Sequence, residues 1–178
     1  MIKVEVETNL GPLDERWFMD QCRTALMEAS LRVNNDFRSA TATWEHRPVF
    51  ASWGPFVENN EIYIEAGPTS FGGLDKIFAL VNAGARPHRI TAKRVPLLRF
   101  RTGYQAKTTP LSLVSRPGGK SGPYRSKRSV SHPGFQPRNF GIAALDKHSG
   151  WWAKRVWKFA QFWPHGASRI RPMRRINI

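Results

Sequence analysis

Two histidines beside prolines are the first candidates for chemistry in this 178-residue chain. His88 follows Pro87, and His132 precedes Pro133, so each histidine is expected in a turn. Gly134 is expected to supply a positive φ in the second turn. Paired histidines can hold a metal ion or transfer a proton. A histidine next to a proline more often hydrogen-bonds the backbone of its own turn. The other histidines lack the His-x-Glu or His-Glu-x-x-His spacing of zinc enzymes, so we expect no metal ion.

The sequence motifs of nucleotide binding and covalent catalysis are also absent. No Gly-Lys-Ser or Gly-Lys-Thr directly follows Gly72-Gly73, which favours a hinge over a phosphate cradle. No serine stands in a Gly-x-Ser-x-Gly elbow. Asp75 and Asp146 are too far apart in the sequence to indicate paired carboxylates. Cys22 is the single cysteine, which excludes an internal disulfide and a cysteine-based zinc site. We therefore expect no catalytic residue and no cofactor.

Charge is distributed unevenly along the chain. Residues 1–65 hold 11 acidic and 6 basic residues, a net charge of −5. Residues 66–178 hold 22 basic and 2 acidic residues, a net charge of +20. This asymmetry indicates two faces with different partners. The basic part can bind phosphates, with release of counterions, or an acidic protein ring, and charge alone does not choose between them.

No apolar run approaches the roughly 18 residues that a membrane span needs, and the N-terminus lacks the apolar core of a signal peptide. We therefore expect no membrane partner and synthesis in a reducing cytosol.

Thirteen prolines and fourteen glycines predict many turns and short elements, typical of an α+β fold. Helical spacing of apolar residues predicts helices over 13–33 and 137–148. Strand-like runs fall at 1–8, 41–53, 61–65, 77–81, 97–100, 111–114 and from Val130 onward. The run at 77–81 is nearly all apolar and is expected to be a buried strand, and Asn59-Asn60 is expected to form a hairpin turn before the run at 61–65.

Two basic segments are expected outside this core. Residues 116–128 read as a mobile loop, either a solvated surface loop or one that touches DNA through Arg116, Lys120, Arg125, Lys127 and Arg128. Residues 149–178 form a basic, Trp-rich extension. Its tryptophans can stack on bases, lie on a membrane surface or, as we favour, contact a neighbouring subunit. The residues on the predicted contact face are at helical spacing: Trp152, Val156, Phe159 and Trp163.

Two short motifs give the chain a family resemblance. The first consists of Gly84, Pro87, His88 and Ile90, followed by Leu98 and Phe100; the second of Val130, His132, Pro133, Gly134, Pro137, Phe140 and the pair Ala143-Ala144. In order and spacing they resemble the tail-completion, or head–tail joining, proteins of long-tailed bacteriophages. The resemblance covers about residues 75–148. The family's usual Thr-Gly-x-Leu-x-x-Ser turn is missing, and Asp36-Phe37-Arg38-Ser39 stands in that region.

The resemblance implies a fold and a place in the virion. It implies a curled antiparallel sheet in residues 1–148, with a hairpin between Gly84 and Leu98 and the N-terminal and C-terminal helices packed against the sheet. Residues 149–178 would then be an appended extension. The protein would form a ring, expected to be a hexamer, that ends the tail tube and joins it to the head–tail connector. Viral DNA would pass through this ring in the virion neck, after assembly in the host cytoplasm.

A nucleic-acid-binding module that uses the basic two-thirds of the chain is the alternative. A nuclease is less favoured, because clustered acidic metal ligands are missing.

Overall fold

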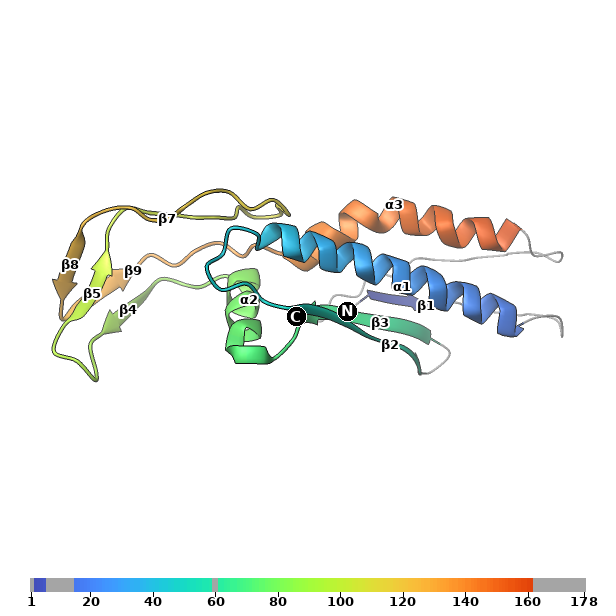
Figure 1. Ribbon diagram of the computed structural model, residues 1–178, viewed down its shortest axis with the longest axis horizontal. Coiled ribbons are helices and arrows are strands. Elements are labelled where there is room, and N and C mark those ends of the chain that lie inside the picture. Colours follow the sequence, from blue (N-terminus) through green and yellow to red (C-terminus); the bar gives the residue numbers. More distant parts are fainter. Residues whose placement is uncertain (1, 6–14, 59–60, 162–178) are drawn as a thin grey trace.

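The computed structural model describes residues 2–5, 15–58 and 61–161 and shows an α+β fold (Figure 1). Three antiparallel strands, β1 (Ile2–Glu5), β3 (Glu61–Pro68) and β2 (Phe50–Glu58), form a sheet in the order β1-β3-β2. Helix α1 (Glu15–Ala40) packs on the β2 and β3 strands, and helix α3 (Phe140–Gln161) packs along α1. The expected α+β class is therefore confirmed.

Strand β3 follows the alternation that the sequence predicts. Ile62 and Ile64 are buried, whereas Tyr63 and Glu65 on the other face are only half-buried. The strand pairs with β1 on one side and β2 on the other. The predicted hairpin residues Asn59-Asn60, between β2 and β3, lie outside the described residues.

Helix α1 is longer than the predicted helix over 13–33 and continues through Asn34 and Asn35 to Ala40. Tertiary contacts stabilise these extra turns: the Asn34 side chain donates to Ser52 Oγ at 2.8 Å, and Arg38 donates to the Phe50 carbonyl at 3.2 Å. Long-range contacts of this kind are invisible to local helix signals. The expected strand over 41–53 begins only at Phe50 for the same reason.

Two apolar clusters make up the core. One joins the first half of α1 to β3 and α3 through Cys22, Ala25, Leu26, Ala29, Ile62, Ile64 and Trp152. The other surrounds four phenylalanine rings with centroids 5.2 to 5.5 Å apart, and its buried members are Val33, Phe37, Ala40, Phe50, Phe78, Phe140 and Ala144. Such spacing is the usual one for packed aromatic pairs.

The predicted buried strand at 77–81 is wrong. This segment belongs to helix α2 (Leu74–Ala83), which follows a short 3-10 turn, η1 (Phe71–Gly73). Phe78 is buried, whereas Ile77 and Leu80 on the same helix are exposed. The periodicity of a short apolar run does not distinguish a strand from a helix. Here the segment is helical.

The first residue of α3 is hydrogen-bonded to a residue near the C-terminal end of α2. The Phe140 N–H donates to Asn82 Oδ1 at 2.7 Å, so an α2 side chain caps the first turn of α3. From there α3 runs without a break to Gln161. The expected division between residues 148 and 149 therefore falls inside a continuous helix.

Residues 85–135, which we call the arm, leave the rest of the described chain, which we call the body, and come back to it (Figure 1). The outgoing and returning halves pair as a bent antiparallel ribbon. Its strand pairs are β4 (His88–Thr91) with β9 (Ser129–His132), β5 (Leu98–Arg101) with β8 (Tyr124–Lys127), and β6 (Tyr104–Gln105) with β7 (Gly119–Lys120).

The arm corrects three expectations. The residues between Gly84 and Leu98 form no hairpin of their own, because β4 and β5 pair with strands 23 to 44 positions later. Residues 116–128 were expected to be a loop but contain the strands β7 and β8. Residues 111–114 form no strand. The strands accordingly make one three-stranded sheet and three two-stranded ribbons among the described residues.

The arm tip, residues 107–116, is fixed to the body at Thr43. Lys107 Nζ donates to the Thr43 carbonyl at 2.6 Å, and the Thr43 hydroxyl donates to the Arg116 carbonyl at 2.9 Å. The Thr43 N–H also donates to Ser115 Oγ at 3.2 Å, and the Leu111 N–H donates to the Arg138 carbonyl at 2.8 Å. The arm is therefore attached to the body at both its root and its tip.

Candidate functional site

The two sequence motifs meet at the root of the arm. His88 and His132 are direct partners in the β4–β9 pair, and their rings stack with centroids 5.0 Å apart. Next to them Ala85 and Phe135 exchange backbone hydrogen bonds of 3.0 and 2.9 Å. Pro87 and Pro133 each adjoin one of the histidines, so the motifs that lie far apart in the sequence build one structure.

Gly84 and Gly134 make this close crossing possible. Both have a positive φ, 78° at Gly84 and 75° at Gly134, as the sequence predicts for Gly134. A Cβ on Gly134 would lie 2.3 Å from the Ala85 carbonyl oxygen, and one on Gly84 would lie 2.6 Å from the Pro137 nitrogen. Only glycine fits at these positions without displacing the backbone.

The histidines at the root are engaged with backbone. His88 Nδ1 lies 2.8 Å from the Arg86 carbonyl oxygen, and the Gly134 N–H donates to His132 Nδ1 at 3.0 Å. These are the contacts expected of histidines in proline-containing turns. In the part of the chain that the structure describes, no three His, Cys, Asp or Glu side chains are grouped to hold a metal ion.

The arm is basic throughout. It contains 12 of the 28 Lys and Arg residues and none of the 13 Asp and Glu residues. Thr108 is the one buried residue in the whole segment 85–135, so the cations face solvent or shallow cavities. The residues predicted to face DNA do not form one patch: Lys120 lies in β7, Arg125 and Lys127 in β8, Arg128 after β8, and Arg116 in the tip.

A cluster that the sequence analysis missed lies where β5 pairs with β8. The guanidinium carbons of Arg99 and Arg101 each lie 4.6 Å from the centroid of the Tyr124 ring. These residues share with Tyr104, Lys107, Lys120 and Glu45 a cavity of about 550 Å³. The alternation Arg-x-Arg could have revealed the pair, but the predicted strand over 97–100 ends before Arg101. Both arginines are exposed.

A second cavity, of about 690 Å³, lies between the arm root and the arm tip. Trp44, Ile77 and Val81 of the body line it, together with His132 and Phe135 of the root and Thr108 of the tip. It exists because the tip folds back to the body and covers the root.

The tryptophan side of α3 faces inward. Trp152, predicted at a subunit contact, is only 9% exposed and packs in the first core cluster. That placement is wrong, because a buried side chain offers no surface to a neighbour. Trp151 beside it lies under the Arg32 guanidinium, 4.3 Å from its ring centroid. Val156 and Phe159 lie within α3, and Trp163 lies outside the described residues.

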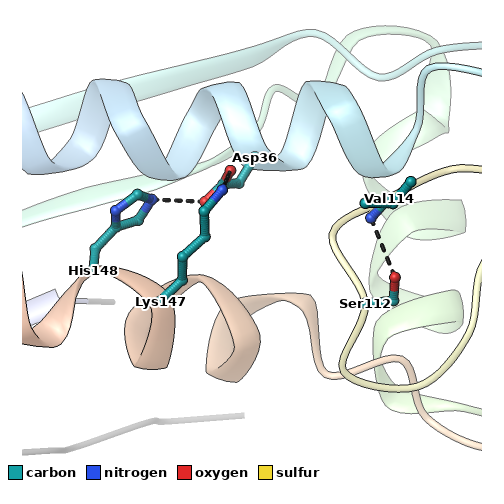
Figure 2. A network of polar contacts seen from close by, with 5 residues as sticks. All are labelled: Asp36, Ser112, Val114, Lys147 and His148. Carbon is teal, nitrogen blue, oxygen red and sulfur yellow. Dashed lines mark hydrogen bonds and ion pairs between the residues drawn. The ribbon is translucent and has the colours of Figure 1, made fainter.

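Polar contacts fasten α3 to α1. Lys147 Nζ and His148 Nε2 approach the two carboxylate oxygens of Asp36 at 2.5 and 2.7 Å, and Figure 2 shows both side chains converging on it. Asp36 is buried, so these contacts replace the water that the carboxylate loses. About two helical turns further along both helices, Arg155 donates to Glu28 at 3.2 Å.

The sheet carries an exposed aromatic patch, which we call the outer sheet patch, consisting of Trp53, Phe56 and Tyr63. The side chains of Trp53 and Phe56 are 42 and 41% exposed, and the rings of Phe56 and Tyr63 lie 5.3 Å apart. The Tyr63 hydroxyl donates to Glu58 at 3.3 Å. Desolvation, followed by the charges of Glu58 and Glu65, raises the pKa of Tyr63. The patch is thus aromatic with an acidic border.

Cys22 shows no sign of reactivity. It is buried in the first core cluster, and this burial raises the pKa of its thiol to about 11. The thiolate that nucleophilic chemistry requires is therefore scarce near neutral pH.

Comparison with known proteins identifies no relative: no family model, no curated protein and no solved structure matches this chain. None of the helices in the described ranges is both long and apolar enough to cross a bilayer.

Proposed function

We propose that this chain is a structural subunit of a phage virion neck, where copies form a ring that ends the tail tube and joins it to the head–tail connector. The observation that carries the proposal is the separation of charge between the arm and the body. The arm holds 12 cations and no acid, whereas all 13 acids lie elsewhere in the chain. Neighbours in a ring meet through two different surfaces, and the difference in charge between the arm and the body supports such a pair of surfaces.

The outer sheet patch supports the same proposal. Trp53 and Phe56 are large, exposed and surrounded by Glu58 and Glu65, in a position that no other described element covers. Aromatic side chains of this kind supply much of the binding energy at protein interfaces. A basic arm or a neighbouring body would complement its acidic border.

The proposal includes finer features of the fold and assembly. We propose that the sheet is curled, that the ring is a hexamer matching the tail tube, and that residues beyond 148 form an extension that reaches a neighbour. The partners are the tail tube protein, the connector protein and the viral DNA in the channel. The protein acts in the virion neck and is assembled in the host cytoplasm.

Sedimentation and native mass spectrometry of the purified full chain, alone and mixed with isolated tail tubes, test this proposal. We expect one ring per tail-tube end, and quantitative mass spectrometry of whole particles should find a single ring's worth of copies. A count of zero, or of hundreds, rules the neck position out. A chain that stays monomeric even with tail tubes rules the ring out.

The second candidate is a nucleic-acid-binding module that works as a single chain, and the uninterrupted basic charge of the arm favours it. Salt dependence separates the two. A module that makes about six phosphate contacts binds duplex DNA with a log–log salt slope near −5. The ring subunit binds as a single chain weakly and with a shallower slope, because it acts in the assembled ring.

A further inference from the structure

We propose that one face of the arm, which we call the tyrosine face, is a binding site for the phosphate groups of DNA. Its residues are Arg99 and Arg101 of β5 and Tyr124 of β8, with Lys120 of β7 beside them. The choice of DNA as the source of the phosphates rests on the proposed function; the site itself rests on the geometry below.

Strand pairing assembles the face. Arg101 is the direct partner of Tyr124, and Arg99 is the partner of Ser126, in the β5–β8 pair. Side chains alternate along a strand, and partners across a pair point to the same side. Arg99, Arg101 and Tyr124 therefore share one side, and all three line the cavity of about 550 Å³.

The same alternation places two other cations on the reverse side. Arg125 is the partner of Phe100, and Lys127 is the partner of Leu98, so this side carries two apolar and two basic residues. Phe100 on this side is aromatic, but among the described residues no cation–π contact joins it to Arg125 or Lys127. The two sides of one strand pair thus carry equal charge but different organisation.

The ring of Tyr124 holds both guanidinium groups in place. Each lies 4.6 Å from the ring centroid, within the range of a cation–π contact. A guanidinium over a ring keeps its N–H groups for an acceptor, and its planar fork suits phosphate oxygens. Two cations that share one ring repel each other, and an anion that binds both relieves this repulsion.

Nothing in the described residues neutralises this cluster. Arg99, Arg101 and Lys120 form no ion pair there, and Glu45 is the single carboxylate lining the cavity, against four cations. One of the four, Lys107, is already bound to the Thr43 carbonyl. Three cations thus remain for phosphate groups, which predicts a log–log salt slope of about −3 for the single chain.

The test compares the two sides of the ribbon in the full-length protein. The double variant Arg99→Gln with Arg101→Gln removes two charges from the tyrosine face, and Arg125→Gln with Lys127→Gln removes two from the reverse side. Binding of a fluorescent 30-base-pair duplex is followed by anisotropy between roughly 50 and 200 mM salt. We expect the first variant to lower the slope by about two, and the second to leave it nearly unchanged. Equal losses in both variants overturn the proposal, because unspecific charge would then explain the binding.

Two variants of Tyr124 test the role of its aromatic ring without changing the net charge of the protein. Tyr124→Leu leaves the net charge unchanged but removes the ring under both arginines, so duplex affinity should fall several-fold. Tyr124→Phe keeps the ring and should bind like the unchanged protein. If Tyr124→Leu also binds like the unchanged protein, the proposed organisation of the arginines is refuted. Thermal melts of all variants should coincide, since these side chains are exposed.

Inorganic phosphate provides the competing ligand. At equal ionic strength, phosphate should displace the duplex no better than chloride, because DNA offers several linked phosphates to the face. Displacement by millimolar phosphate alone would instead identify a free-phosphate site and overturn the assignment to DNA. Sedimentation of the same variants keeps the two proposals distinguishable. If the protein forms rings but both double variants lose DNA binding equally, only this inference is refuted. If DNA binding depends on the tyrosine face but the chain never forms rings, only the proposed function is refuted.

Discussion

His88 and His132 lie directly opposite each other across the arm root, 44 positions apart in the sequence, with their rings stacked 5.0 Å apart. One ring is held by the Arg86 carbonyl and the other by the Gly134 N–H. The pair therefore closes the base of the 51-residue arm, and the residues next to it determine whether this base can form.

The closure should depend on Gly134. We expect Gly134→Val to lower the free energy of unfolding by about 1–3 kcal/mol, since φ is 75° and a Cβ would lie 2.3 Å from the Ala85 oxygen. Urea unfolding measures the change. Gly150→Ala is the control: Gly150 is exposed within α3 with open space around it, so the change should stabilise by about 0.5–1 kcal/mol. Equal stability of Gly134→Val and the unchanged protein would contradict the turn.

The contact between α1 and α3 should depend on Asp36. Asp36→Asn removes the charge that Lys147 and His148 both approach, so we expect a loss of about 1.5–3 kcal/mol in unfolding free energy. Asp20→Asn tests an exposed ion pair, with Arg23 at 3.1 Å, and should cost about 0.5 kcal/mol or less. Similar losses in the two variants would show that burial of Asp36 contributes nothing.

Trp152 and Trp53 should affect different properties. Trp152→Ala empties a place in the core cluster and should cost about 3 kcal/mol or more in unfolding free energy. Trp53→Ala removes an exposed ring from the outer sheet patch and should weaken ring assembly while the melting temperature stays within a few degrees. Melting curves and sedimentation on both variants give the answer. The reverse pattern would return Trp152 to the subunit contact and exclude the outer sheet patch.

Cys22 should make stability depend on alkaline pH. Folding raises its pKa from 9.0 to about 11, so the buried thiol contributes stability that is fully present below pH 9. This contribution is lost as pH rises through 11, because the unfolded thiol then gains free energy by ionising. Unfolding curves between pH 8 and 11 should therefore fall more steeply for the unchanged protein than for Cys22→Ala. Parallel curves would mean that the thiol ionises equally well in both states.

Local patterns in the sequence predicted those parts of the fold that local forces determine. The period-2 run around Ile62 and the helical face around Leu26 appear where they were expected, and Gly134 has the predicted positive φ. The arm could not be predicted in this way, since β4 finds its partner about 40 residues later and no local pattern encodes that pairing.

The candidate site was predicted only in part for the same reason. Lys120 was identified from the density of cations around it, whereas Arg99 was assigned to the predicted strand over 97–100 and Arg101 was not singled out. Their role becomes visible only when β8 brings Tyr124 alongside. Trp152 shows the opposite error: its helical spacing was predicted correctly, but the face it belongs to packs on α1 and the sheet.

The fastening of the arm tip at Thr43 also determines how far the subunit extends. Straightened at about 3.3 Å per residue, the outgoing half from Ala85 to Lys107 would span about 70 Å. With the tip bound at Thr43, the ribbon is bent back toward the C-terminal end of α1 and is not straight (Figure 1). The fastening consists of a few hydrogen bonds, each of which contributes about 1 kcal/mol. A partner that bound at Thr43 would have to replace these hydrogen bonds, at a cost of a few kcal/mol.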